Sequence, residues 1–422
     1  MKIAIIGSGI SGLTCAWKLA PTHQVTLFEA NDYLGGHTAT VDVTLEGQHY
    51  AIDTGFIVYN ERTYPNFIAL LAELGISGQP TEMSFSVTHP DSGLEYNGHT
   101  LNTLFAQRRN LLNPRFYRFL LEIVRFNRLC KKRLSEASIG SETLDEFLQQ
   151  NAFSLYFAQH YLLPMGAAIW SSSMADMRQF PLALFLRFFD HHGLLDVTNR
   201  PQWFVVPGGS REYVRRMLTA LAGKITLYLN TPVQRVERHP QHCLIHSALG
   251  EQQFDQVIFA CHADQALHLL SEVSPLEQRI LSQLPYQANE VVLHTDTQLL
   301  PRQRRAWASW NYLLPANEGL AEAQRASVTY NMNILQGLQA PHTFCVTLNP
   351  QQAIEPTKIL RRFNYYHPVF NQASVQAQQQ RSLINGQQNT WFCGAYWYNG
   401  FHEDGVRSAL DVTQALLQAQ PV

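Results

Sequence analysis

Charge and paired cysteine are both scarce in this sequence. Charged residues make up 15% of the 422 residues and the formal net charge is −2, so we expect no nucleic-acid partner. No uncharged apolar run reaches about 18 residues, so no membrane-spanning helix is predicted. The six cysteines are scattered without a C-x-x-C pair, which favours reduced thiols in a cytoplasmic protein. Met1 and Lys2 lead directly into a predicted strand, which leaves no room for a cleavable signal.

The first 29 residues have the pattern of a dinucleotide-binding unit. Residues 2–20, KIAIIGSGISGLTCAWKLA, join a strand that is apolar on both faces to a glycine turn and a helix. The turn has G-x-G-x-x-G spacing at Gly7, Gly9 and Gly12, and a second apolar run ends at Glu29. Strand, glycine turn, helix, strand and acid in this order predict a Rossmann-like nucleotide site.

Each part of this pattern has a predicted role. Gly7 allows the tight turn, Gly9 lets a pyrophosphate approach the backbone, and Gly12 lets the helix pack on the strand. The phosphates would lie at the helix N-terminus near Ile10 and Ser11. Glu29 would bind the ribose hydroxyls, and Ala30 beside it is a further cofactor-binding candidate.

A second glycine turn follows the acid and points to one kind of dinucleotide. Residues 27–40, LFEANDYLGGHTAT, contain Gly35, Gly36 and His37, and Thr54, Gly55 and Phe56 come soon after. With these motifs the chain resembles the superfamily of flavin amine oxidases, protoporphyrinogen oxidases and phytoene desaturases. The resemblance implies FAD as the cofactor, with the glycine pair packed against its diphosphate. An arginine commonly follows that pair in the superfamily, and His37 takes its place here.

The same resemblance assigns cofactor contacts far along the chain. It implies that the backbone of Val233 contacts the adenine. It also implies that Gly394 and Ala395 lie beside the phosphate or ribityl part, and that the backbone of His402 contacts the flavin. A helix predicted to begin near Glu403 would point its positive N-terminus at the flavin.

These separated motifs predict an α/β fold with a discontinuous FAD-binding domain and a mixed α+β substrate domain that includes a helical insertion. The expected segments are 1–75, 201–265 and 386–422 for the FAD-binding domain, and 76–200 (helical) and 266–385 for the substrate domain.

Several residues are candidates to face the substrate or the flavin. Trp170 belongs to an aromatic-rich span that could line an apolar cavity, although such residues also form cores. By resemblance, Tyr366 and Phe401 stand where amine oxidases place two aromatic side chains before the flavin. Those enzymes also place a lysine near the flavin N5, whereas the corresponding stretch here offers Asn289 or Glu290. Residues 225–357 contain no lysine at all, which counts against an ordinary amine oxidase.

No side chain can be assigned a catalytic role from the sequence, and no metal site is expected. Adjacent side chains diverge on a helix or strand, so Asp190, His191 and His192 do not form a ligand set. The chemistry is therefore expected to come from the flavin, with the protein orienting the substrate and excluding water.

Four motifs narrow the resemblance to a bacterial branch of FAD oxidoreductases that is often grouped with cyclopropane-fatty-acid-synthase-like methyltransferases. They are DTGFIVYNERTYPN, PMGAAIW, NEVVLHTD and GFHEDG. This resemblance implies an FAD-dependent dehydrogenase or desaturase of an acyl or lipid-like substrate, with a methyltransferase as a candidate partner. The alternatives are a flavin amine oxidase, a redox-neutral isomerase or mutase, and a non-catalytic flavin-binding partner in a lipid-modifying complex.

One predicted helix has two interpretations. The segment 113–134, NPRFYRFLLEIVRFNRLCKKRL, opens with Asn113 as a predicted N-cap and Pro114 in the first turn. Its cationic face could bind an anionic membrane, at the inner face of which the protein would then be peripheral. The other interpretation is a domain helix with a solvated face.

Overall fold

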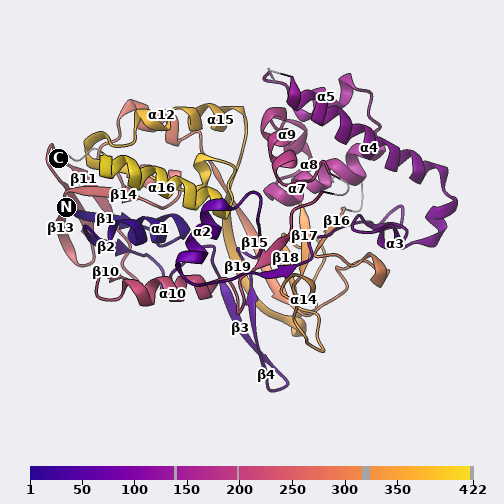
Figure 1. Ribbon diagram of the computed structural model, residues 1–422, viewed down its shortest axis with the longest axis horizontal. Helices are drawn as coiled ribbons and strands as arrows, with labels where there is room; N and C mark the ends of the chain where they lie inside the picture. Colours follow the sequence, from indigo (N-terminus) through magenta and orange to yellow (C-terminus); the bar gives the residue numbers. More distant parts are fainter. Residues whose placement is uncertain (137–139, 197–198, 316–323, 419–422) are drawn as a thin grey trace.

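The computed structural model describes residues 1–136, 140–196, 199–315 and 324–418. The expected segments 76–200, 266–385 and 386–422 therefore each include residues outside this description. Figure 1 shows two parts side by side, with the N-terminus in one and helices α3 to α9 at the far end of the other.

The first part is built on a parallel sheet of five strands, as the sequence predicted. In spatial order these are β10 (Ile225–Tyr228), β2 (Gln24–Phe28), β1 (Lys2–Ile6), β14 (Gln256–Phe259) and β20 (Thr390–Phe392). Three stretches that are distant in sequence thus supply one sheet. The strands are short and largely apolar on both faces, which suits a parallel sheet covered on both sides.

Alternating side chains of β1 enter two different cores. Ile3 and Ile5 pack in a cluster with helices on one face, whereas Ala4 and Ile6 pack with a small sheet and further helices on the other. The first face carries α1 (Ile10–Leu19), α2 (Pro65–Glu73), α10 (Arg211–Leu221) and α16 (His402–Gln418). The second carries the antiparallel strands β11 (Arg235–Arg238), β12 (Cys243–Ser247) and β13 (Gly250–Phe254), with α11 (Ala263–Leu269), α12 (Pro275–Leu281) and α15 (Gln372–Gln379).

The second part is built on a seven-stranded sheet that is antiparallel apart from one parallel pair. Its order is β19 (Ile359–Pro368), β15 (Tyr286–His294), β18 (Cys345–Leu348), β17 (Ser327–Asn331), β16 (Trp310–Leu313), β7 (Phe85–His89) and β8 (Leu94–Asn97). Smaller pairings involve β3 (Thr40–Leu45) with β4 (Gln48–Asp53), and β9 (Trp203–Val205) with β5 (Tyr59–Asn60) and β6 (Gln79–Thr81). Helix α14 (Met332–Leu335) follows β17. The predicted combination of a Rossmann-like domain with a mixed α+β domain is confirmed.

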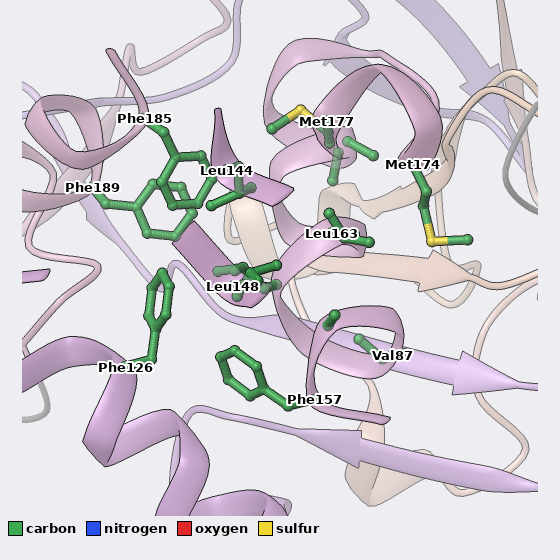
Figure 2. Packing of buried hydrophobic residues seen from close by; sticks show 14 of the residues in the cluster. Val87, Phe126, Leu144, Leu148, Phe157, Leu163, Met174, Met177, Phe185 and Phe189 are labelled. Atoms are coloured by element: carbon green, nitrogen blue, oxygen red, sulfur yellow. The ribbon is translucent and has the colours of Figure 1, made fainter. Parts of the chain in front are cut away.

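A helical insertion, residues 101–195, packs against the β7–β8 side of this sheet. Its helices are α3 (Leu101–Leu104), α4 (Pro114–Ser135), α5 (Leu144–Gln150), α6 (Leu155–Phe157), α7 (Leu163–Trp170), α8 (Met174–Arg178) and α9 (Leu182–His191). Short 3₁₀ and π turns, η1 (Arg108–Leu112) and η2 (Ala158–Leu162), connect them. Figure 2 shows how Phe126, Phe157, Phe185 and Phe189 interlock with leucines and methionines of the same core.

The start of α4 is as predicted, and its cationic face is solvated in part. The Asn113 side chain accepts a hydrogen bond from the backbone N–H of Arg115 at 3.1 Å, so Asn113 is the N-cap. Glu122, at helical spacing from Arg118 and Arg125, is buried and accepts from the backbone N–H and hydroxyl of Ser154 at 2.9 and 2.6 Å. Arg125 is half-buried over the ring of Phe153. Arg118 and Lys132 remain exposed, so the cationic face is solvated except at Glu122 and Arg125.

No helix in the described part of the chain is both long enough and apolar enough to cross a membrane.

Candidate active site

The glycine loop after β1 is closed on one side and open on the other. Gly7 has a φ of +102°, which a residue with a side chain rarely adopts. A Cβ on Gly12 would lie 1.9 Å from the carbonyl oxygen of Gly7, so α1 packs directly on the loop. A Cβ on Gly9 would meet no atom within 4 Å. The loop thus leaves free space beside Gly9, at the N-terminus of α1, where Ile10 and Ser11 begin the helix.

Glu29 follows β2 and is buried beside this loop. Its carboxylate accepts hydrogen bonds from the backbone N–H and hydroxyl of Ser8, at 3.0 and 2.6 Å. It also accepts from the backbone N–H and amide of Asn31, both at 2.9 Å. Two of these four donors are side-chain groups that can rotate away and yield to ribose hydroxyls. The next residue, Ala30, is exposed, and Val233 is buried in the loop whose Thr231 N–H donates to the Glu29 carbonyl at 2.9 Å.

The second glycine turn lies directly on the first. The backbone N–H of Gly35 donates to the Ser8 carbonyl at 3.0 Å, and a Cβ on Gly36 would lie 3.2 Å from the Cα of Gly9. The carbonyl of His37 accepts from the backbone N–H of Phe56 at 2.8 Å, and a Cβ on Gly55 would lie only 2.1 Å from it. The two predicted glycine motifs and the Thr54–Phe56 segment are therefore one packed unit.

The N-terminus of α16 closes the same unit from the end of the chain. The His402 ring stacks on Phe56 with centroids 3.7 Å apart, and its Nε2 lies 2.8 Å from the Tyr213 hydroxyl. The Ser11 hydroxyl donates to the Gly405 carbonyl at 3.0 Å, which ties α1 to α16. Because the His402 side chain is engaged, its backbone at the first turn is the part left for a ligand, where helical N–H groups have no partner within the helix.

The strand before α16 ends at a residue without space for a side chain. A Cβ on Gly394 would lie 2.2 Å from the ring of Tyr396, and the Gly394 N–H donates to the Ser408 hydroxyl at 3.0 Å. Ala395 follows half-buried and opens the short turn η7 (Ala395–Trp397).

Histidines gather where the glycine turns meet the edge strand β19. The His37 ring lies 5.5 Å from His367 and 5.2 Å from Tyr365, between centroids. Burial, followed by the neighbouring His367 and His262 rings, lowers the pKa of His37 to about 3, and burial and His262 lower that of His367 to about 4. Both are neutral at physiological pH. The Nε2 of His37 is buried without a hydrogen-bond partner among the described residues, as expected of an atom that contacts a ligand.

A chain of amide groups fixes the protonated nitrogen of His367. The backbone N–H of Glu290 donates to the Asn349 side-chain oxygen at 3.1 Å, so the Asn349 amide nitrogen must be the group that donates to the Asn289 oxygen at 2.8 Å. The Asn289 amide nitrogen then donates to the carbonyl of Gln287 at 3.2 Å and to Nδ1 of His367 at 3.3 Å.

The same nitrogen of His367 lies 2.9 Å from the Ser171 hydroxyl, which must therefore donate. With Nδ1 accepting, the proton of the neutral ring lies on Nε2. Asn289, which is fully buried, thus orients a histidine whose Nε2–H can donate to a bound group.

Aromatic side chains connect the helical insertion to this site. The ring centroid of Phe188 on α9 lies 4.8 Å from that of Trp170 on α7. It also lies 4.8 Å from the ring centroid of Phe401, which precedes α16. Ser171, which contacts His367, directly follows Trp170 in a left-handed conformation with φ of +54°. The insertion, the β15–β19 edge, the second glycine turn and the start of α16 therefore meet in one region.

Two of the predicted site residues lie outside this convergence. Successive side chains of β19 point to opposite faces, so Tyr365 and His367 face His37 and Tyr366 does not. Tyr366 is 48% exposed, and its ring centroid lies 6.3 Å from that of His262. Glu290 is on the opposite face of β15 from Asn289 and forms an ion pair with Arg362. Sequence reasoning did not single out His367, although its position in a strand that alternates with Tyr365 was visible in YYHPVF.

These residues fit an FAD molecule. The loop leaves space beside Gly9, and the N-termini of α1 and α16 offer backbone N–H groups of the kind that bind a dinucleotide. The buried Nε2 of His37 is a further polar atom without a partner among the described residues. The residues that would bind it are the glycines of both turns, Glu29, and the backbone around Gly394 and His402.

Comparisons with known proteins agree with this geometry. Residues 10–340 match the model of the flavin containing amine oxidoreductase family. A fatty acid isomerase from P. acnes has a TM-score of 0.68 at 15% identity, over 99% of this chain and 98% of that one. A cyclohexylamine oxidase from Brevibacterium oxydans gives 0.69 at 15%, over 99% and 98%. Putrescine oxidase gives 0.67 at 13%, over 99% of both chains. No curated protein matches the chain by sequence.

Proposed function

This chain belongs to the family of flavin containing amine oxidoreductases and is an FAD-dependent oxidoreductase, and we propose that its substrate is an apolar acyl chain rather than an amine. The observation that carries the proposal is the lining of the convergence region. Trp170, Phe188 and Phe401 are apolar, and His37 and His367 are neutral. A hydrocarbon chain gives up no hydrogen bonds to water on entering such a region, whereas an ammonium group would lose its hydration and would find no charged side chain among these five residues.

Two further observations support the acyl substrate. Residues 225–357 contain no lysine, so β15 lacks the group that amine oxidases of the superfamily place near the flavin N5. One of the proteins similar in fold is a fatty acid isomerase that produces CLA, and a fold that accommodates a fatty acid in one protein supports the same class of substrate here. That similarity also makes a redox-neutral isomerase the second candidate function.

The protein's own groups have distinct tasks in this proposal. When bound, FAD would supply the acceptor for a hydride from one carbon of the chain, while the neighbouring carbon would release its proton to a water molecule, and the two losses leave a carbon–carbon double bond. Phe401, Phe188 and Trp170 would hold the chain in the reacting position. Asn289 is a positioning residue, because it keeps the Nε2–H of His367 available as a donor.

Anaerobic stopped-flow absorbance of the holoenzyme tests the substrate class. We expect oleate, linoleate or a detergent-dispersed phosphatidylglycerol to bleach the oxidised flavin band, and benzylamine and putrescine to leave it unchanged. Phe401→Ala should retain FAD and slow reduction by about tenfold or more, since small misplacements of reacting groups cost up to about a hundredfold. Rapid reduction by an amine would overturn the proposal. Conversion of linoleate without bleaching would identify the isomerase.

Asn289→Asp tests the positioning role. A carboxylate at this position would accept from His367, so the ring proton should move from Nε2 to Nδ1. Histidine nitrogen NMR of the ¹⁵N-labelled protein would detect this shift, and we expect reduction to slow by about tenfold, the range of one lost hydrogen bond to a bound group. Glu290→Gln alters the adjacent residue on the opposite face of β15 and is the matched control. It should change neither the tautomer of His367 nor the rate of flavin reduction. An unchanged tautomer in Asn289→Asp would refute the role.

A further inference from the structure

The helical insertion exposes an unusual number of large apolar side chains. The described residues contain fifteen exposed large hydrophobics, and seven of them fall between positions 101 and 155. Leu112, Leu101 and Leu121 are 90, 77 and 69% exposed. The seven are Leu101, Leu111, Leu112, Tyr117, Leu121, Val124 and Leu155. Single exposed leucines need no explanation, but a concentration of this kind marks an interaction surface.

These side chains are on neighbouring elements. Tyr117, Leu121 and Val124 are four and three residues apart on α4 and so form one stripe. The Tyr117 hydroxyl donates to the Leu111 carbonyl at 3.0 Å, which joins the stripe to η1. The Arg115 guanidinium lies 4.3 Å from the ring centroid of Tyr156. Arg115 is two residues from Tyr117, so α6 and its Leu155 lie on the other side of α4 from the stripe.

The same segment carries a concentrated positive charge. Residues 101–135 contain nine arginines and lysines and one acid, Glu122, in a chain whose net charge is −2. Glu122 is buried and cannot neutralise the surface. Lys131 pairs with Asp196 and Arg133 with Glu136 and Glu142. Three more cations, Arg118, Arg128 and Lys132, are exposed and have no ion-pair partner among the described residues.

We propose that this apolar and cationic surface of η1 and α4 docks the enzyme on an anionic lipid bilayer. Leucine side chains that insert at the boundary between headgroups and acyl chains would be buried in an apolar environment. Arginines at the same depth would bind lipid phosphates. A protein partner would have to supply acidic side chains along the whole segment, whereas an anionic bilayer presents phosphate everywhere. The proposal names where the enzyme meets an acyl substrate, and in this respect it rests on the proposed function.

The docking surface and the candidate active site are two faces of one insertion. The inward side chains of α4, Phe116, Phe119 and Phe126, belong to the same core cluster as Trp170 and Phe188, against which Phe401 packs. Figure 1 shows α4 along the outer edge of the molecule, on the far side of the insertion from the FAD-binding domain. A bilayer bound to α4 would therefore contact the part of the protein that lines the proposed acyl site.

Vesicle co-sedimentation of the holoenzyme tests the docking, without any substrate turnover. The vesicles are phosphatidylglycerol with phosphatidylcholine in equal amounts, and phosphatidylcholine alone. We expect the wild type to bind only the anionic vesicles and to be released by high salt. Leu112→Ser with Leu121→Ser, and separately Arg118→Glu with Arg128→Glu, should each weaken binding by about tenfold or more. The controls Leu249→Ser and Lys224→Glu, at exposed positions outside the insertion, should bind as the wild type does.

The outcomes separate this proposal from the proposed function. Every variant is first checked for its flavin absorbance and melting temperature. Wild-type protein that ignores anionic vesicles at low salt, or controls that lose binding equally, would overturn the docking. A wild-type dimer that Leu112→Ser with Leu121→Ser converts to a monomer, without vesicle binding, would assign the surface to a second protein copy. Flavin reduction by detergent-dispersed acyl substrate is measured independently, so either proposal can fail alone.

Discussion

The FAD-binding part and the helical insertion are stabilised by different means. In the first, two buried carboxylates each have several partners: Glu29 accepts four hydrogen bonds, and Asp53 accepts from the Ser210 backbone N–H and hydroxyl at 2.9 and 2.9 Å. In the insertion, aromatic and aliphatic side chains fill one large cluster. A few residues at fixed positions specify the first part, whereas total volume and apolar pattern specify the second.

If this contrast is correct, one added methyl group in the glycine loop should disrupt both FAD binding and folding. We expect the largest effect from Gly12→Ala. Its Cβ would lie 1.9 Å from the Gly7 carbonyl oxygen, so α1 must move away from β1. We expect loss of bound FAD and a fall in unfolding free energy of about 3 kcal/mol or more, at or beyond the usual cost of overpacking. Released-flavin absorbance and thermal unfolding measure the two effects.

Gly9→Ala is the matched control, because the added methyl group meets no atom within 4 Å. The apoprotein should melt within about 2 °C of the wild type, as surface substitutions do. FAD should bind at least about tenfold more weakly, since the methyl group occupies the space that the diphosphate needs. Equal FAD affinity in Gly9→Ala and wild type would place the diphosphate elsewhere.

A buried carboxylate beside Phe401 gives the FAD-binding part a distinct dependence on pH. Asp404 accepts from the backbone N–H groups of Phe401 and Asn399 at 2.9 and 3.2 Å, and burial raises its pKa from 3.8 to about 7. The folded state thus binds a proton that the unfolded state releases between about pH 4 and 7. Its contribution to stability is full below pH 4 and is lost as the pH rises through 7, by on the order of 4 kcal/mol at most.

Asp404→Asn removes this titration while its oxygen can still accept both hydrogen bonds. The melting temperature of the wild type minus that of the variant should therefore fall from pH 4 to pH 7 and stay constant above. Because both proteins share every other titrating group, the difference isolates Asp404. A difference that is flat across this range would show that Asp404 is ionised throughout.

The sequence predicted the cofactor half well because its chemistry depends on backbone geometry at glycines. Gly7, Gly9 and Gly12 and the pair Gly35–Gly36 have recognisable spacings, and the turns they predict are present. The residues near 225 and 235 have the alternation of two paired strands, yet β10 joins the parallel sheet and β11 joins the small antiparallel one.

The candidate site was predicted less completely, since it depends on which face of each strand points inward. Strand β19 is an edge strand with mixed polarity, so its sequence alone does not say that Tyr365 and His367 rather than Tyr366 face His37. The tautomer of His367 requires Asn289, Asn349 and a backbone N–H to meet across three segments. Such long-range contacts leave no local pattern in a sequence.

The smallest expected effect concerns the exposed leucines of η1 and α4, and it distinguishes them from the buried face of α4. Leu112→Ser and Leu121→Ser should each change the unfolding free energy by no more than about 0.5 kcal/mol, because these side chains gain little burial on folding. Phe119→Ala, on the buried face of the same helix, should cost about 3–5 kcal/mol. Chemical denaturation of the three variants measures both values. If the leucines prove as costly as the phenylalanine, they are part of the core and are unavailable to a bilayer. If they cost nothing, their aliphatic side chains are dispensable for folding, which is the condition that a docking surface must meet.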